Sequence, residues 1–299
     1  MKITIIGTGL MGSSLGLALK KSGHFITGVD SEPLHLEQAQ SIGAIDRSLP
    51  LQMALADAQL VVLCVPVDVT IELLAEVMDS VSEGTTVMDM GSTKLEICKS
   101  VGHHSRRSNF VAVHPMAGVE HSGPLAAHVD LYLNAKVIIC EPQKSSSHAL
   151  NMVLTVLQEL KMKVIFMDSA QHDRQLALVS HLPQVMAYAL ASLEDFDSES
   201  NRQWVELGGG GLQSSIRLGK SSAKMWMPVF QQNKEHISNY IDSYIDRLKA
   251  MKQMIEANDT QNMEESIKIA NANYEKLYYS NNKAKSSVEI QGAPKVYYS

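Results

Sequence analysis

The chain has 299 residues, of which 45% are hydrophobic and 19% charged, and its formal net charge is −6. This is an ordinary globular composition, and the length allows two domains of roughly 100–200 residues each. The acidic balance argues against nucleic acid or an anionic membrane as partner, and no stretch approaches the ~20 uninterrupted apolar residues of a membrane span.

The first part of the chain alternates short apolar strands with helices. Strands are predicted at Lys2–Ile6, Phe25–Asp30, Leu60–Val65, Thr86–Met90, Phe110–Val113, Lys136–Cys140 and Lys163–Met167. Helices are predicted at Ser14–Lys21, Glu32–Ile42, Ile71–Val81 and Val153–Leu160. This alternation is typical of an open, mostly parallel, doubly wound α/β sheet. We therefore expect a Rossmann-type dinucleotide-binding domain over residues 1–167.

A glycine fingerprint, Gly7, Gly9 and Gly12, follows the first strand directly and precedes a helix. The first glycine permits a tight turn, the second lets the backbone approach a pyrophosphate, and the third lets helix and strand pack closely. A pyrophosphate would then lie at the helix N-terminus, whose free N–H groups attract anions. Residues expected to line the same site are Leu10, Met11 and Val65.

Asp30 ends the second strand, near the distance of ~20 residues at which the fingerprint places an acidic residue. A carboxylate there can accept hydrogen bonds from the adenosine ribose and would repel a 2′-phosphate. Because Ser31 follows rather than arginine, the sequence favours NAD over NADP as cofactor. The alternative is that the glycines form only a turn and that Asp30 only caps a strand.

After Asp168 the strand patterns disappear, and we expect an all-α domain over residues 168–299 that binds substrate and forms a dimer. Gln171–Leu193 has a long helical pattern broken only by Pro183, and the glycines of Gly208–Gly211 predict a loop. A heptad-like seam runs along the later helix through Ile237, Ile241, Tyr244, Leu248, Met251 and Ile255. Such a seam needs a partner helix, either in a homodimer or within the same fold.

The three cysteines, Cys64, Cys98 and Cys140, lie in or near apolar runs without the spacing of metal ligands. We expect them to be reduced thiols of a cytoplasmic protein, and no metal site is predicted.

Polar residues follow two strands and also interrupt the first helix of the second domain. They are Asp89–Lys94 after one strand, His114–Gly118 after the next, and Ser180–Gln184 in the helix. The carboxyl ends of the strands form the edge at which open α/β sheets bind ligands. The sequence therefore predicts that these segments carry the chemistry.

At these residues the sequence resembles a known family. The motifs GTGLMGSS, GSTK, HPMAG, HD and SHLP, followed by Arg217-Leu218 and Met225-Trp226, occur in the order found in the prephenate/arogenate dehydrogenases of tyrosine biosynthesis. The resemblance covers residues from about 3 to 233, and HPMAG with SHLP is far more specific than the glycine fingerprint. It implies oxidation of a cyclohexadiene hydroxyl by hydride transfer to NAD, with loss of CO₂ and aromatisation.

The resemblance also implies roles for individual residues. His114 matches the catalytic histidine, which accepts the hydroxyl proton. Ser92 matches the serine that orients this histidine and the substrate hydroxyl. Arg217 matches the arginine that binds a substrate carboxylate, because a guanidinium fork suits that group. His181 matches a further histidine of the active site. Gln184 stands where members that prefer prephenate often carry a histidine, so prephenate and arogenate remain equal candidates as substrate.

Structural interpretations stand beside these roles. His114 could end a strand, Ser92 could cap the helix Lys94–Ser100, Arg217 could form a surface ion pair, and His181 could be a core histidine. His172-Asp173 is interpreted as a mainly structural pair at a helix start. Lys94 could reach a phosphate or carboxylate, but it is interpreted as a solvated lysine at a helix start.

The passage before Arg217 departs from the family's G-F-R-D-x-T-R pattern, because an arginine, an aspartate and the threonine are missing. That leaves an altered substrate or altered regulation open. The sequence leaves two other functions open. A dehydrogenase of the β-hydroxyacid or 6-phosphogluconate type would be expected to place a catalytic lysine on a helix of the second domain. A non-catalytic NAD-binding sensor would not need the Ser92/His114 pair.

Overall fold

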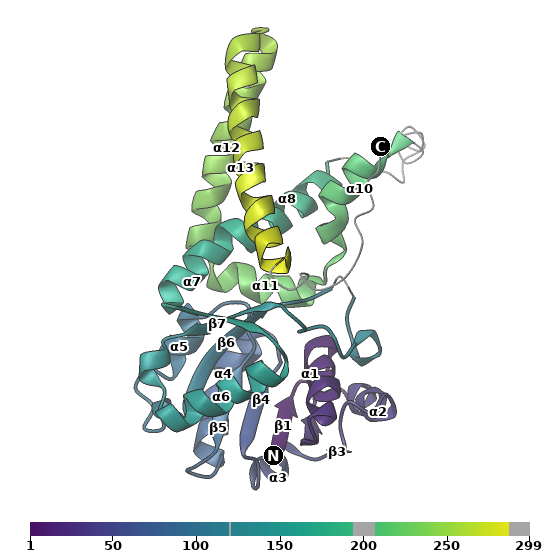
Figure 1. Ribbon diagram of the computed structural model, residues 1–299, viewed down its shortest axis with the longest axis vertical. Helices are drawn as coiled ribbons and strands as arrows, with labels where there is room; N and C mark the ends of the chain where they lie inside the picture. Colours follow the sequence, from purple (N-terminus) through teal and green to yellow (C-terminus); the bar gives the residue numbers. More distant parts are fainter. Residues whose placement is uncertain (120, 194–206, 287–299) are drawn as a thin grey trace. The chain divides into compact units, whose positions relative to one another are not determined.

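The structure is a computed structural model that describes residues 1–119, 121–193 and 207–286. Its chain divides into two compact units, Met1–Tyr240 and Ile241–Ser299. The first unit contains a sheet and most of the helices, and the second contains the end of one long helix and the helix after it (Figure 1).

The sheet of the first unit has eight strands in the order β3-β2-β1-β4-β5-β6-β7-β8. Their bounds are β1 Lys2–Ile6, β2 Phe25–Val29, β3 Arg47–Ser48, β4 Leu60–Leu63, β5 Thr86–Asp89, β6 Phe110–Met116, β7 Lys136–Cys140 and β8 Lys163–Met167. All neighbouring pairs are parallel except β6 and β7. The predicted mostly parallel, Rossmann-type sheet is confirmed.

Helices cover both faces of the sheet and bury its apolar side chains in two clusters. One cluster includes α1 (Leu10–Lys21) and α6 (Ser147–Glu159), and the other includes α4 (Val67–Ser80) and α5 (Leu95–Ser100). The remaining helices of this part are α2 (Pro33–Ser41) and α3 (Leu51–Leu55). The strands β4 and β5 are buried on both faces, which explains their continuous apolar runs.

Strand β6 is longer than the sequence predicts and contains His114 and Pro115, which we expected to follow it. The added residues pair with β7, as in His114↔Ile138. On its other side β6 pairs with β5 only as far as Ala112, so Pro115, which lacks an N–H group, breaks no ladder there. The short strand β3 and helix α3 were not predicted.

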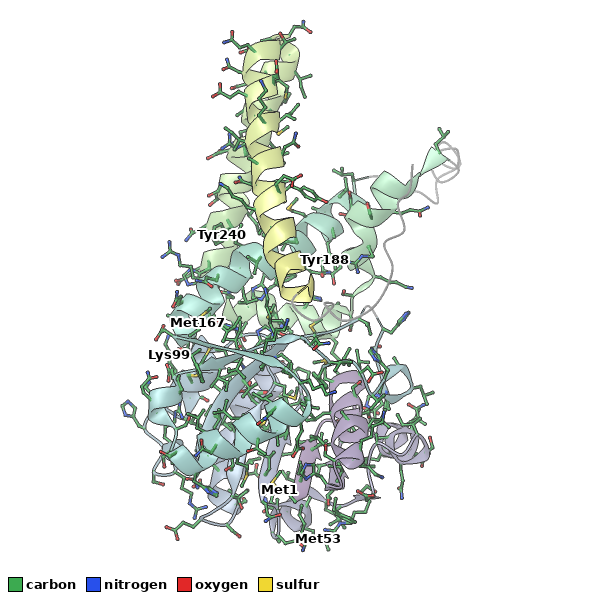
Figure 2. All side chains as sticks on the ribbon, viewed as in Figure 1. Met1, Met53, Lys99, Met167, Tyr188 and Tyr240 are labelled. Atoms are coloured by element: carbon green, nitrogen blue, oxygen red, sulfur yellow. The ribbon has the colours of Figure 1, made fainter. Side chains whose placement is uncertain are left out.

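After β8 the described chain is helical. The first segments are α7 (Ser169–Leu176), a π-helical turn (Ala177–His181) and α8 (Leu182–Ala191). The expected interruption at Pro183 is present, because the π-helical turn directly precedes α8 and Pro183 lies in the first turn of that helix, where its missing N–H is not needed. Tyr188 (Figure 2) ties α8 to the next segments, since its hydroxyl donates to the carbonyl of Ser221 at 2.8 Å.

The segments that follow include the glycine run. They are α10 (Gly210–Ile216), a 3-10 turn (Arg217–Lys220), α11 (Ala223–Gln232) and α12 (Lys234–Glu256). The loop predicted for Gly208–Gly211 is only half right, because Gly210 and Gly211 begin α10 after the extended Gly209.

The second unit consists of the last part of α12 and of α13 (Thr260–Ser286), which lie side by side as a hairpin (Figure 1). Asn258 turns the chain between them with a φ of 50°. The apolar seam is partly open to solvent here, since Leu248 and Ile255 are 47% and 65% exposed while Ile241, Tyr244 and Met251 are half-buried. No helix within the described residues has the length and apolarity needed to cross a membrane.

Candidate functional site

A cavity of about 1090 Å³ opens at the carboxyl ends of the strands in the first unit. Its wall combines the turn after β1, the ends of β2, β4 and β5, residues of β6, and the segment around the start of α11. Open α/β sheets bind ligands at this edge. The expected site residues on the wall are Gly7, Gly9, Leu10, Met11, Asp30, Val65, Ser92 and His114.

The three glycines of the fingerprint have different surroundings. Gly7 has a φ of +93°, and a Cβ atom on it would lie 2.6 Å from the carbonyl oxygen of Cys64. A Cβ on Gly12 would lie 1.9 Å from the carbonyl oxygen of Gly7, so Gly12 allows helix α1 to pack on the turn. A Cβ on Gly9 would meet nothing within 4 Å. The backbone at Gly9 is therefore open to a ligand, as a dinucleotide pyrophosphate requires.

Asp30 is held in place at the end of β2. Its Oδ2 atom accepts from the backbone N–H of Thr8 at 2.7 Å and from the Thr8 hydroxyl at 3.1 Å, while Oδ1 accepts from the N–H of Glu32 at 2.9 Å. A carboxylate has about four lone-pair sites, so Asp30 retains capacity for a ribose hydroxyl. The turn, the helix N-terminus and this carboxylate together fit an adenine dinucleotide.

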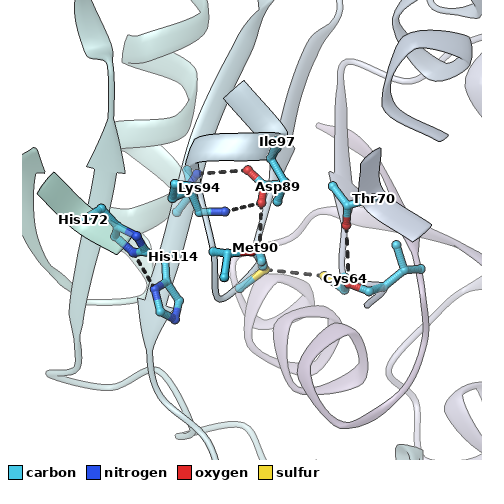
Figure 3. Close-up of polar contacts among 12 residues, drawn as sticks. Cys64, Thr70, Asp89, Met90, Lys94, Ile97, His114 and His172 are labelled. Carbon is cyan, nitrogen blue, oxygen red and sulfur yellow. Dashed lines mark hydrogen bonds and ion pairs between the residues drawn. The ribbon is translucent and has the colours of Figure 1, made fainter. Parts of the chain in front are cut away.

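His114 lies near the end of β6 and belongs to a chain of three side chains with His172 and Asp173, of which Figure 3 shows the contact between His114 and His172. Its Nδ1 atom is 2.8 Å from Nε2 of His172, and Nδ1 of His172 is 2.7 Å from Oδ1 of Asp173. His114 is 8% exposed and His172 is fully buried. Interpreting His172-Asp173 as a helix-start pair missed this contact; Asp168 caps α7 instead, accepting from the N–H of Ala170.

Asp173 also fixes the segment that carries the GSTK motif. Its carboxylate accepts from the backbone N–H of Lys94 at 2.8 Å and of Leu95 at 3.0 Å, at the start of α5. The proposed cap by Ser92 is absent, since no side chain of α5's own segment caps it. Lys94 is fully buried and pairs with the buried carboxylate of Asp89, so the expectation of a solvated lysine is wrong.

The surroundings of His114, His172 and Asp173 determine which of these side chains carry a charge. Burial lowers the pKa of His114 well below 6.5, and the nearby His172, Lys94 and His181 lower it further. Burial also lowers the pKa of His172, against the hydrogen bond to Asp173. Burial would raise the pKa of Asp173, but hydrogen bonds from His172 and from the N–H of Leu95 outweigh it and lower the value. The resting site therefore holds two neutral imidazoles and a carboxylate.

Ser92 is half-buried on the cavity wall, after β5. Among the described side chains it makes no hydrogen bond to His114, whose Nδ1 partner is His172. The Ser92 hydroxyl is therefore available to a ligand in the cavity.

Three predicted substrate-binding residues lie off this wall. His181 is fully buried; its Nδ1 is 3.1 Å from the Asn233 amide nitrogen, and its ring meets Trp226 edge-on at 5.9 Å. Gln184 is 1% exposed and donates to the carbonyl of Leu218 at 2.6 Å. Arg217 begins the adjoining 3-10 turn with its side chain at the surface.

The cavity wall instead has two lysines that the sequence reasoning missed, Lys220 and Lys224. They lie at the end of the 3-10 turn and in the first turn of α11. The only sequence signal was their closeness to Arg217 and to the Met225-Trp226 motif. They give the wall the positive charge that a carboxylate or phosphate ligand requires.

Comparison with known proteins gives consistent results. Residues 15–166 match the family model described as "Prephenate dehydrogenase, nucleotide-binding domain", and residues 168–269 match "Prephenate dehydrogenase, dimerization domain". A prephenate dehydrogenase of Lactococcus lactis is 30% identical over 267 residues, which cover 88% of this chain and 73% of that protein. A cyclohexadienyl dehydrogenase of Zymomonas mobilis is 27% identical, covering 89% of this chain and 92% of that protein.

A solved structure adds a three-dimensional match. The prephenate dehydrogenase of Aquifex aeolicus, crystallised with hydroxyphenyl propionate and NAD⁺, superposes with a TM-score of 0.83 at 28% identity. The match covers 93% of this chain and 98% of that one. The fold is therefore shared over most of the chain.

Proposed function

This chain belongs to the prephenate dehydrogenase family, and on that premise we propose that it catalyses the NAD-dependent oxidative decarboxylation of prephenate, arogenate or both. The observation that carries the proposal is a buried histidine, His114, on the wall of the same cavity as the dinucleotide turn. A protein that only binds NAD has no need of such a proton acceptor there.

Gly7, Gly9 and Gly12, with Leu10 and Met11, would hold the pyrophosphate of NAD at the start of α1. Asp30 would bind the adenosine ribose, and Val65 would pack against the cofactor at the end of β4. NAD supplies the hydride acceptor when it is bound. The carboxylate of Asp30 disfavours a 2′-phosphate, which supports NAD over NADP.

His114 would act as the general base. Its pKa, lowered by burial, keeps the imidazole neutral at physiological pH, so its free nitrogen can take the proton of the substrate hydroxyl as the hydride leaves. Ser92, half-buried on the wall, would donate a hydrogen bond to the substrate oxygen. Release of CO₂ and formation of an aromatic ring then make the reaction effectively irreversible.

The substrate carboxylates need cations or donors. We propose that Arg217 binds one of them, since it begins the turn whose last residue, Lys220, lines the cavity. Gln184 supports this turn by its bond to Leu218, and we propose that it affects the choice between the pyruvyl and alanyl side chains. His181 would support the pocket from behind its wall, because it is buried against Trp226.

We further propose a domain boundary after residue 167, which agrees with the gap between the two matched family models. The chain carries a family dimerization domain, and the exposed seam residues Leu248 and Ile255 on α12 support a homodimer formed through the C-terminal helices. The free thiols of Cys64, Cys98 and Cys140 fit a cytoplasmic location.

The test is a spectrophotometric assay of NADH formation, with prephenate and arogenate offered in parallel and NADP offered in place of NAD. We expect turnover with NAD on at least one compound, and the ratio of kcat/KM values reports the preference. His114→Ala is the control: kcat should fall by roughly 10²–10⁴, the usual contribution of a general base, while NAD still binds. NAD binding without turnover on either compound would contradict the proposal.

Gln184→His serves as a second variant that addresses the substrate. If Gln184 affects the choice, this change should shift the ratio of kcat/KM for the two compounds toward prephenate. An unchanged ratio in a folded variant would show that Gln184 does not affect the choice of substrate.

A further inference from the structure

We propose that His172 and Asp173 are positioning residues that hold His114 in the tautomer protonated on Nδ1, so that its Nε2 atom accepts the substrate proton. The inference rests on the proposed function, because it assigns these residues a task in the same reaction. It concerns a pair for which the sequence indicated only a structural role.

The geometry is a continuous chain from the interior to the cavity wall, and Figure 3 shows its outer contact, between His172 and His114. Oδ1 of Asp173 is 2.7 Å from Nδ1 of His172, and Nε2 of His172 is 2.8 Å from Nδ1 of His114. Both distances are those of good hydrogen bonds. Asp173 and His172 are 1% and 0% exposed, so water does not compete for these contacts, whereas His114 reaches the cavity wall.

The positions of the protons follow from the acceptor at the inner end. An ionised carboxylate only accepts hydrogen bonds, so Nδ1 of His172 must carry a proton. A neutral imidazole has one N–H, which leaves Nε2 of His172 as an acceptor. Nδ1 of His114 must then donate to it, and Nε2 of His114 is left with a free lone pair.

Asp173 can determine which nitrogen atoms carry the protons because its own carboxylate is held in place. Besides His172, its carboxylate accepts the backbone N–H groups of Lys94 and Leu95 at 2.8 and 3.0 Å. These donors hold it ionised and prevent it from rotating away. In a serine protease a carboxylate holds the catalytic histidine in one tautomer. Asp173 would do the same for His114, but through a second imidazole, His172, that lies between them.

The proposed step balances in protons and electrons. The substrate O–H bond breaks and its proton forms an N–H bond at Nε2 of His114. The C–H electron pair leaves as hydride to NAD, and the carbon–oxygen bond becomes a carbonyl. The positive charge that arises on His114 is then stabilised through Nδ1–H by His172 and the carboxylate of Asp173.

The first test needs no substrate. In the protein labelled with ¹⁵N-histidine, the imidazole nitrogen shifts of His114, assigned by their loss in His114→Gln, report which nitrogen carries the proton. We expect a protonated Nδ1 and a bare Nε2 in the wild-type protein. A bare Nδ1 in His114 would overturn the proposal whether or not the protein oxidises either cyclohexadiene.

The second test compares two substitutions of one residue. In His172→Leu the N–H of His114 has no acceptor, and we expect kcat to fall by roughly 10²–10³, within the range of a lost general base, with KM and NAD affinity little changed. In His172→Gln the amide oxygen can accept from Nδ1 of His114, so kcat should recover by at least tenfold over His172→Leu. Equal loss in both variants, or no loss in a folded His172→Leu, would overturn the proposal.

Ser169→Ala is the matched control, because Ser169 lies on the same helix and donates a buried hydrogen bond to Glu141 at 2.7 Å. It should lower the thermal stability without changing kcat or the nitrogen shifts of His114. The two experiments separate the proposals. An inactive protein with a protonated Nδ1 refutes the dehydrogenase function alone, and an active one with a bare Nδ1 refutes only the positioning role.

Discussion

Lys94 and Asp89 form an ion pair in which both side chains are completely buried. The carboxylate also accepts from the N–H of Gly91 at 2.8 Å and from that of Val113 at 3.2 Å, next to His114. This pair therefore joins the end of β5, the GSTK segment and β6. It brings the loop that bears Ser92 and the strand that bears His114 to one edge of the sheet.

Replacing Lys94 by methionine should destabilise the protein strongly. The change leaves the carboxylate of Asp89 buried without its cation, and breaking a buried pair in this way costs about 3–5 kcal/mol. The free energy of unfolding, measured with urea, is the readout. Lys99→Met is the control, because Lys99 (Figure 2) pairs with Glu96 at the surface of the same helix. Equal stability of the two variants would contradict the assigned role of the buried pair.

Two glycine substitutions should separate cofactor binding from folding. Gly9→Ala adds a methyl group that meets no protein atom within 4 Å, so the fold should tolerate it while NAD affinity falls at least tenfold. Gly12→Ala places a methyl group 1.9 Å from the carbonyl of Gly7, so it should lower the Tm. Titration of NAD and thermal unfolding measure the two effects. If Gly9→Ala bound NAD normally, the pyrophosphate would not lie against Gly9.

The pH dependence of kcat/KM should follow His114. Burial, with help from His172 and Lys94, lowers the pKa of His114 well below 6.5, so the neutral base persists as the pH falls. We expect the acidic limb of the kcat/KM profile, which reports the free enzyme, to lie below pH 6.5. A midpoint at or above pH 6.5 would contradict this prediction: either another group would titrate in this limb, or His114 would not be buried.

The folded fraction of the protein must be measured over the same pH range as kcat/KM, because acid also destabilises the fold. Burial lowers the pKa of His181 to about 4, against an unfolded value of 6.5. Because the unfolded chain then binds the proton more readily, this residue's contribution to stability is present above pH 6.5 and is lost as the pH falls toward 4. Activity that declines together with the folded fraction would not report on His114.

Charge on the open seam should weaken the proposed dimer. Leu248 and Ile255 are 47% and 65% exposed on α12, and Leu248→Glu would place a carboxylate in an apolar contact between copies. Light scattering after gel filtration should show a dimer for the wild type and more monomer for the variant. Lys249→Glu is the control, since Lys249 lies beside the seam and is exposed. A wild-type monomer would refute the dimer.

The part of the site that could be predicted from sequence rests on local rules. Gly7, Gly9 and Gly12 follow a strand and precede a helix, and the bounds of β1, β7 and β8 agree with the prediction, because short apolar runs between turn residues indicate strands. His114 and Ser92 were found from motifs, and both line the cavity.

The remaining parts depend on how the folded chain buries and pairs its residues. Asp89 is only five residues before Lys94, but no local pattern indicates that the two will be buried as a pair. Nor does a local pattern indicate that Asp173, 79 residues further on, will cap the helix after Lys94. The length of β6 depends in the same way on its antiparallel partner β7, which pairs with His114 and Pro115. Local periodicity does not contain such tertiary contacts.

The chain of His114, His172 and Asp173 crosses the boundary between the two matched family models. Its outer imidazole comes from the nucleotide-binding half, and its inner imidazole and carboxylate come from the half that follows. A nucleotide-binding half produced alone would retain the dinucleotide turn but lose the partners of its base. Chimeras of relatives joined near residue 167 would therefore have to preserve not only the packing between the two halves but also the hydrogen bonds that link His114, His172 and Asp173.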